Sequence, residues 1–151
     1  MELEESYCIR IQRLGVGDET MLMQVADDVF DHAVCLDLTR QFLSEQHNLL
    51  VVALDQDLVV GMGSGLFYVH PDKKHELWIN EVGVSPIYQR RGIARAIVLK
   101  MQERAKTLGC TACWLLTEPD NQAANGLYGS LPGWAGPEKA MLYSIDFSPE
   151  G

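Results

Sequence analysis

The sequence predicts one mixed α/β (α+β) domain, and three observations support this. The chain has 151 residues and is 47% apolar, which suffices for one hydrophobic core and not for two independent ones. Stretches with the two-residue period of a strand alternate with stretches of helical period. A strand, a glycine turn and a long helix follow one another over residues 77–108. We therefore expect a single domain over residues 1–151.

The first elements are predicted from periodicity and capping residues. Residues 7–14 alternate between apolar and polar side chains, as a half-buried strand does. A helix is expected after Asp18, which is a suitable N-cap residue. Its apolar positions recur at helical spacing and are Met21, Leu22, Val25, Val29 and Phe30. A second short helix is expected over about residues 37–46.

A hairpin follows. Residues 49–54 and 58–69 are rich in β-forming side chains and are separated by Asp55-Gln56-Asp57, which indicates two strands joined by a tight turn. Three glycines occupy alternate positions in the second strand, so one face carries no side chains and another group can approach it closely. They are Gly61, Gly63 and Gly65.

The second half begins with the clearest unit. Residues 77–84 form an apolar strand that Ser85-Pro86 ends. A long helix then starts near Ile93, keeps helical spacing of apolar residues and stops at Gly109. The remaining expected elements are a short strand over residues 113–117, a weaker helix over 120–131 and a closing strand over 140–147.

The charge distribution is uneven. The net charge is −9, which disfavours a general nucleic-acid binder because such proteins present a broad basic face. Residues 89–106 nevertheless hold six basic side chains and one acid. This local basic segment favours an anionic cofactor on one side and a cationic substrate on the other. A solubilising surface with one basic helix explains the same pattern.

Nothing in the sequence indicates a membrane protein. No run of about 18 apolar residues occurs, and residues 1–5 lack the basic start and apolar stretch of a signal peptide. We expect a cytoplasmic protein.

The cysteines do not form a recognisable framework. Cys110 and Cys113 make one C-x-x-C pair, whereas Cys8 and Cys35 stand alone. Structural zinc sites usually have a second pair or suitably spaced histidines, which this chain lacks. We expect reduced thiols and no metal, and a thiol or zinc protein is the alternative.

The helix start after the central strand favours binding of phosphate. In the run Gln89-Arg90-Arg91-Gly92-Ile93-Ala94, Gly92 lets the backbone approach a ligand, and Arg90 and Arg91 add positive charge. The first helical turn also leaves N–H groups without an intrahelical acceptor. The run is neither a P-loop nor a dinucleotide-binding turn. A plain helix start with two surface arginines is the alternative interpretation.

Two segments resemble the motifs of a known family. Val82-Gly83-Val84-Ser85-Pro86 followed by Gln89–Ala94 resembles motif A of the GNAT N-acetyltransferase superfamily, Gln/Arg-x-x-Gly-x-Gly/Ala after the fourth strand. Asn121 to Ala124 with Leu127-Tyr128, and then Gly133-Trp134, resembles motif B. The motifs occur in the family's order and spacing, and the resemblance covers residues 77–134. It implies a mixed sheet of six to seven strands, splayed in the middle and flanked by about four helices.

The resemblance also implies acetyl-coenzyme A (acetyl-CoA) as cosubstrate. It places the pyrophosphate on backbone N–H groups of residues 90–95 and the pantetheine arm between the two splayed strands, where it pairs like an extra strand. Asn121 matches a pantetheine contact, and Tyr128 matches a tyrosine near the thioester sulfur. The residues implied in cofactor binding are Val82, Val84, Gln89, Arg90, Arg91, Gly92, Ile93, Ala94, Arg95, Asn121 and Ala124.

Amide formation requires a base, because a protonated amine is not a nucleophile. Glu81 is the candidate general base: partial burial at the end of an apolar strand would raise its pKa toward neutrality, although a solvent-facing glutamate fits the sequence too. The oxyanion needs an N–H donor, expected near Val82 or Gly83. Tyr128 is the candidate general acid for the departing thiolate, since both groups have pKa values of about 8.5 to 10. Aromatic packing is its other reading, and Cys113 is not expected to act as a nucleophile.

The acceptor is predicted from a narrower resemblance. Residues 76–85 and 141–146 are similar to the aminoglycoside 3-N-acetyltransferase branch, which implies antibiotic resistance and a polycationic acceptor that acidic side chains attract. The expected substrate-binding residues are Asp28, Asp31 and Asp146, with Asp27 and Glu118 behind them. The alternatives are another small amine, a polyamine, a protein amino group, or a non-catalytic acetyl-CoA sensor. The resemblance also allows a homodimer.

Overall fold

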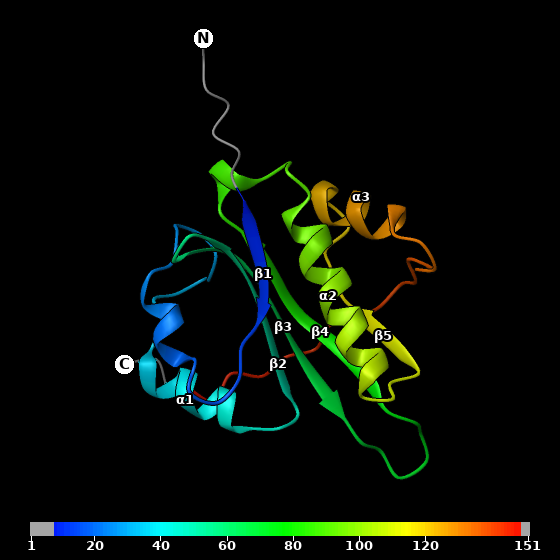
Figure 1. Cartoon of the computed structure of the whole chain (residues 1–151). Coiled ribbons are helices and arrows are strands. Elements are labelled where there is room, and N and C mark those ends of the chain that lie inside the picture. The colour runs from blue at the N-terminus through cyan, green and yellow to red at the C-terminus, as the bar shows by residue number, and fades with distance from the viewer. Residues whose placement is uncertain (1–7, 149–151) are drawn as a thin grey trace. The chain divides into compact units, whose positions relative to one another are not determined.

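The computed structural model describes residues 8–148 (Figure 1). Its contacts divide the chain between Leu116 and Thr117 into two compact units, which are described separately below. The first unit contains a five-stranded sheet with strand order β1-β2-β3-β4-β5. The expectation of one domain over residues 1–151 stays a prediction.

The five strands of the first unit agree with the strands predicted up to residue 117. They are β1 (Ile9–Arg13), β2 (Asn48–Asp55), β3 (Leu58–Tyr68), β4 (Glu76–Val84) and β5 (Ala112–Leu115). The first four strands run antiparallel to their neighbours, and β5 runs parallel to β4. The predicted hairpin is confirmed, because Asp55 of β2 lies opposite Leu58 of β3.

Helix α2 (Ile93–Thr107) covers one face of this sheet (Figure 1). The glycines of β3 allow this close approach. A Cβ atom added at Gly63 would lie 2.6 Å from both Ile97 Cγ2 and Met101 Sδ. Ile97 and Met101 are fully buried. The bare face predicted for β3 is therefore confirmed, and it receives the helix that the chain itself supplies.

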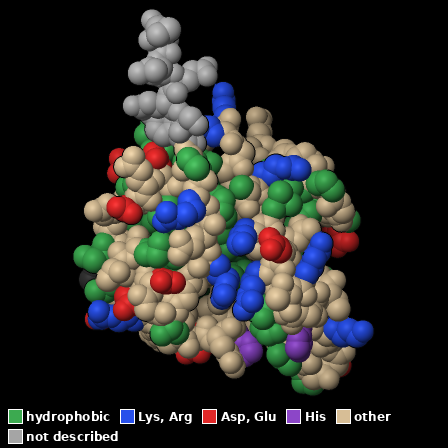
Figure 2. All heavy atoms as spheres, in the orientation of Figure 1, with side chains coloured by type: hydrophobic (Ala, Val, Ile, Leu, Met, Phe, Trp, Pro, Cys, Tyr) green, Lys and Arg blue, Asp and Glu red, His purple; other side chains and the backbone are tan. Residues whose placement is uncertain are grey.

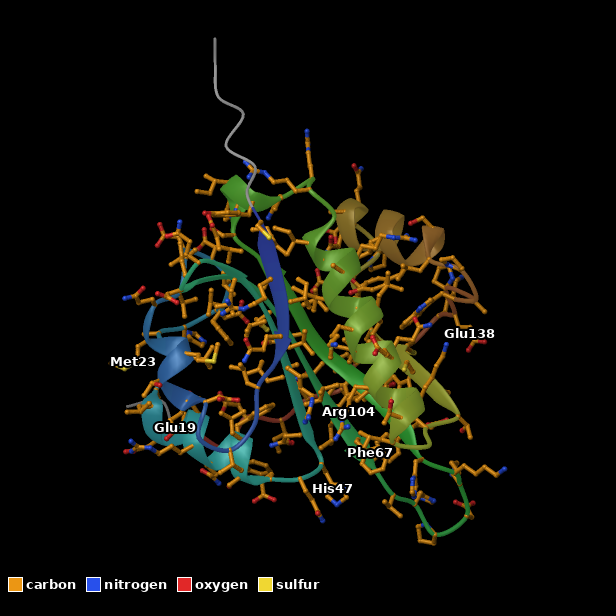
Figure 3. The ribbon with its side chains drawn as sticks, viewed as in Figure 1. Glu19, Met23, His47, Phe67, Arg104 and Glu138 are labelled. Carbon is orange, nitrogen blue, oxygen red and sulfur yellow. The ribbon has the colours of Figure 1, made fainter. Side chains whose placement is uncertain are left out.

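The opposite face of β2 and β3 carries a cluster of buried apolar side chains. It is covered by α1 (Leu36–Ser44) and by the 3-10 helix η1 (Glu19–Met23). Glu19, labelled in Figure 3, accepts a hydrogen bond from Arg40 of α1 at 3.4 Å and so links the two helices. At the far end of this hairpin, the rings of His47 and Phe67 stack with centroids 5.5 Å apart (Figure 3). The buried members of the cluster are Leu14, Leu22, Val29, Leu43, Leu50, Val52, Leu54, Val59 and Met62.

The helix predicted to follow Asp18 is wrong beyond its first turn. Only η1 forms, and the Asp18 carboxylate accepts from the Gly15 N–H at 2.8 Å instead of capping the helix. The chain then bonds to β3: the Ala26 N–H donates to the Val59 carbonyl at 2.8 Å, and the Val59 N–H donates to Gln24 at 2.9 Å. Backbone groups that a helix would use are thus taken by the sheet.

The second unit contains helix α3 (Gln122–Ser130). The strand predicted over residues 140–147 is wrong, because no strand forms there. Its apolar side chains are exposed, and a strand needs a neighbour to bond its backbone groups. The expected six to seven strands and about four helices become five strands and three α-helices within residues 8–148.

Candidate functional site

Strands β4 and β5 separate halfway along β4. Their pairing runs from Glu76 opposite Ala112 to Ile79 opposite Leu115 and then stops. Strand β4 continues to Val84 and pairs there with β3 alone. In the part of the chain that the structure describes, no strand pairs with the other edge of residues 80–84. This is the place where the sequence predicts splayed strands, and it leaves a strand edge open to a ligand.

A β-bulge lies at this point and decides which way Glu81 faces. Ser64 pairs with Glu81 and Gly65 pairs with Ile79, so Asn80 has no opposite residue in β3. In a regular strand, Trp78 and Glu81 would point to opposite faces because they are three residues apart. The unpaired residue reverses the alternation. Both side chains therefore lie on the sheet face opposite α2.

The loop that follows η1 packs on this face at Gly83. A Cβ atom added at Gly83 would collide with the Val29 carbonyl oxygen, so only glycine permits this approach. The same loop places Asp31 beside Glu81. Partial burial raises the pKa of Glu81, and the charge of Asp31 and a hydrogen bond with it raise that pKa further. Asp28 of this loop has a left-handed backbone, with φ +61°.

A short turn connects the open end of β4 to α2. It contains the 3-10 helix η2 (Pro86–Tyr88), and the Tyr88 hydroxyl donates to the Asp55 carboxylate at 2.6 Å. The Arg91 guanidinium lies 5.4 Å from the centre of the Tyr88 ring. The Gln89 side chain donates to the Val84 carbonyl at 3.1 Å, so a group expected to face the cofactor is bonded within the chain.

Helix α2 begins with the geometry of an anion-binding turn. Gly92 occupies its N-cap with φ +76°, and Arg90 has φ +64°. The Ala96 N–H makes the bond to the Gly92 carbonyl at 3.0 Å, so the N–H groups of residues 93–95 precede the first intrahelical bond. Lys and Arg side chains gather on the face that carries α2 (Figure 2). Partial positive charge from the helix and full charge from arginines suit a diphosphate.

The second unit holds the predicted residues of motif B. The Asn121 side chain caps α3 by accepting from the Ala124 N–H at 3.1 Å. The ring of Tyr128 lies 5.7 Å from that of Trp134, and burial raises the pKa of Tyr128. Asp146 is exposed and accepts from the Ser148 N–H at 2.8 Å. The strand expected to present Asp146 does not form.

The predicted site residues thus fall into two groups. In the first unit, the predicted residues follow one another from the open edge of β4 to the start of α2. They are Glu81, Val82, Val84, Gln89, Arg90, Arg91, Gly92, Ile93, Ala94 and Arg95, with Asp31 beside Glu81. The second unit holds Asn121, Ala124, Tyr128 and Asp146. Their catalytic and binding roles stay predictions.

The surroundings of the Cys110–Cys113 pair disfavour reactive thiolates. All four are free thiols. Burial and the neighbouring Cys110 raise the pKa of Cys113 to about 11, which disfavours the thiolate a nucleophile needs. Within residues 8–148 there is no group of three side chains able to hold a metal ion, and no helix is long and apolar enough to cross a membrane.

Comparison with known sequences identifies the family. Residues 18–131 match the family described as Acetyltransferase (GNAT) family. The chain belongs to the GNAT acetyltransferase family. The match includes the open edge of β4, the turn at Gly92 and all of α3, so the GNAT motifs coincide with the geometry described above.

Two GNAT relatives show how far the similarity extends. An acetyltransferase of Pectobacterium atrosepticum, ECA0875, is 29% identical over 96 residues, which are 64% of this chain and 64% of that protein. The match thus spans just under two thirds of that relative. The L-2,4-diaminobutyric acid acetyltransferase of Streptomyces coelicolor is 28% identical over 95% of this chain and 86% of its own.

Solved structures show the same fold at low identity. The aminoglycoside acetyltransferase meta-AAC0020 from an uncultured soil metagenomic sample superposes with a TM-score of 0.78 at 17% identity, covering 91% of this chain and 95% of that one. Aminoglycoside N-acetyltransferase AAC(6')-Iy in complex with CoA gives a TM-score of 0.73 at 17% identity, covering 95% and 99%. The resemblance to the 3-N branch therefore rests on the sequence alone.

The sequence-based prediction missed three aromatic residues on the Glu81 face of this GNAT sheet. Tyr68, Trp78 and Trp114, here called the aromatic platform, come from β3, β4 and β5. Trp78 and Trp114 are direct partners in the parallel pairing. One signal was available: each tryptophan lies within a strand predicted from the sequence, and a strand directs alternate side chains to opposite faces. The pairing register that joins them is a tertiary property.

Proposed function

We propose that this chain transfers the acetyl group of acetyl-CoA to an amine of a small cationic acceptor, an acyltransferase reaction of EC class 2.3.1. The observation that supports it most is the open edge of residues 80–84, which leads directly to the helix start at Gly92. The pantetheine arm would pair with that edge, and the pyrophosphate would lie on the N–H groups of residues 93–95. Gln89 must then turn away from the Val84 carbonyl.

The proposed chemistry uses Glu81 and Tyr128. Glu81 takes a proton from the acceptor amine, whose nitrogen attacks the thioester carbonyl directly. The oxyanion forms near the backbone of Val82 and Gly83. When the carbon–sulfur bond breaks, Tyr128 donates its proton to the thiolate. A tyrosine hydroxyl is protonated at neutral pH and can therefore donate, and burial raises the pKa of Tyr128 further.

We infer an aminoglycoside as the acceptor. Its several ammonium groups suit the acids near Glu81, and solved structures named aminoglycoside acetyltransferases share the fold. Asp28 and Asp31 are the proposed acceptor contacts in the first unit, and Asp146 is the one in the second. The 3-N position is the regiochemistry favoured by the sequence. A small diamino acid is a second candidate, because the relative aligned over 95% of this chain is a diaminobutyric acid acetyltransferase.

Calorimetry and an amine panel test this proposal. Acetyl-CoA is expected to bind, and binding to weaken at high salt because the arginines contribute charge. Gentamicin, neamine, 2,4-diaminobutyrate and spermine are then assayed as acceptors, with mass spectrometry of the product to locate the acetyl group. Absence of heat with acetyl-CoA refutes acetyl transfer, and turnover of 2,4-diaminobutyrate alone refutes the aminoglycoside.

A further inference from the structure

The aromatic platform forms a connected side-chain cluster that the proposed chemistry does not use. The rings of Trp78 and Trp114 stack with centroids 5.8 Å apart and planes inclined by 19°. The Trp114 Nε1–H donates to the Tyr68 hydroxyl at 3.3 Å, and that hydroxyl donates to the Glu76 carboxylate at 2.6 Å. Each ring is therefore fixed by a neighbour from another strand.

The platform lies on the same sheet face as Glu81. Leu77 and Ile79, which alternate with Trp78, are buried on the α2 side, where Leu77 and Met101 both lie against Gly65. Trp78 thus points to the other face, and the bulge at Asn80 brings Glu81 to that face as well. The two tryptophans are also the last pair but one before β4 and β5 separate. The platform borders the point where the proposed acetyl group would arrive.

The surface chemistry of the platform suits a cationic ring. Trp78 lies between Leu66 of β3 and Trp114 of β5, and the side chains of Leu66 and Trp114 are each 37% exposed. A flat aromatic side chain offers a broad apolar face on which a saturated ring can pack, and ammonium groups held on that ring add to the attraction. Glu76, Glu81 and Asp31 supply negative charge beside it. His32 also acts on Glu81, in the opposite sense to Asp31, and the His75 ring packs edge-on against Phe67.

We propose that the aromatic platform is the floor on which one ring of the acceptor rests while an amine on a second ring reaches Glu81. This inference rests on the proposed acetyl transfer and specifies its acceptor as an amine with linked rings. Trp78 and Glu81 are three residues apart on β4, which is about 10 Å at the rise of a strand. Two linked six-membered rings span such a distance, whereas a single ring does not.

The test compares a two-ring amine with a linear one of equal charge. Neamine and spermine each carry four amino groups, so the acids attract both, but only neamine can stack. Trp114→Ala is expected to raise the KM for neamine about tenfold and to leave the KM for spermine and the Kd for acetyl-CoA within twofold. Trp114→Phe keeps an aromatic face and is expected to restore most of the loss.

Matched variants separate stacking from stability. Leu99→Ala truncates a side chain of similar exposure, 40%, on α2 and is expected to change neither KM. Thermal unfolding of each variant shows whether it is folded. A KM for neamine that stays within twofold in Trp114→Ala, or equal increases for neamine and spermine, overturns the platform while acetyl transfer stands.

A direct binding measurement distinguishes failure of the platform from failure of the proposed function. If the wild-type protein gives no heat with acetyl-CoA, acetyl transfer is refuted, and neamine is then titrated alone. Neamine binding that Trp114→Ala weakens about tenfold supports the platform as a ring-binding surface. Neamine binding that is absent, or unchanged in the variant, overturns it.

Discussion

The two halves of β4 belong to one strand but differ in their pairing and burial. Residues 76–79 pair with strands on both sides, and Leu77 and Ile79 are almost fully buried. Residues 81–84 pair with β3 only, Asn80 is unpaired, and none of the side chains of residues 80–84 is buried. The first half holds the sheet together, whereas the second offers an edge, a carboxylate and a path to α2. One continuous strand thus joins the buried core to the proposed binding surface.

The largest expected effect separates the halves by chemistry. Glu81→Gln removes the proposed base from the open half and is expected to lower kcat about a thousandfold. Thermal stability should change little, because glutamine has nearly the same size and shape as glutamate. Steady-state kinetics and thermal unfolding check both parts. Glu103→Gln, an exposed glutamate on α2, is the control and should retain full activity. A kcat within fivefold of wild type would remove Glu81 from the mechanism.

The paired half should respond in stability. Leu77 is 0% exposed, so Leu77→Ala leaves a cavity beneath α2 and is expected to lower the free energy of unfolding by about 3 kcal/mol. Urea denaturation measures the change. Leu38→Ala, at a side chain 65% exposed on α1, should cost less than about 0.5 kcal/mol. Equal losses in the two variants would show that the buried half of β4 is not a stability element.

Gly83 tests the junction between the open half and the loop above it. Gly83→Ala places a methyl group against the Val29 carbonyl oxygen, so the loop that carries Asp31 must shift, at a cost of about 2 kcal/mol. Gly126→Ala, in a helix with free space around it, is expected to stabilise the protein slightly. Chemical denaturation compares the two. A neutral result for Gly83→Ala would contradict the close packing.

The smallest expected effect concerns pH. Glu81 can act as the proposed base only when it is deprotonated. Burial and Asp31 raise its pKa, so activity should be lost at a higher pH on acidification than with an ordinary glutamate as the base. Asp31→Asn removes the repelling charge and should move this acid limb of kcat/KM to lower pH. A pH–rate profile measures the limb. An unchanged or upward-shifted limb would show that Asp31 does not control Glu81.

Local patterns account for the parts that the sequence predicts well. The run from β4 through Gly92 to the end of α2 was predicted because its strand period, turn residues and helical period are contiguous in the chain. The direction of the Glu81 pKa was also predictable, since a carboxylate in an apolar strand is partly desolvated. The same holds for the hairpin at Asp55.

Long-range contacts account for the features that could not be predicted from the sequence. After Asp18 the sequence has a helical pattern, but the backbone groups of Gln24 and Ala26 bond to Val59, more than thirty residues later, and not within a helix. The apolar alternation of residues 140–147 is real, yet a strand forms only where a partner strand is present. The contact of Asp31 with Glu81 and the pairing of Trp78 with Trp114 depend on register, which periodicity does not specify.

Because Asn80 is unpaired, the number of residues that separate Trp78 from Glu81 bears on whether the two side chains share a face of the sheet. An odd separation, as between Trp78 and Glu81, puts the two on one side only if a residue is left over between them. Removing Asn80 would shorten the gap by one and restore plain alternation, a change in length with no loss of either functional group. A family member with an even gap between the two residues would reach the same arrangement without a bulge.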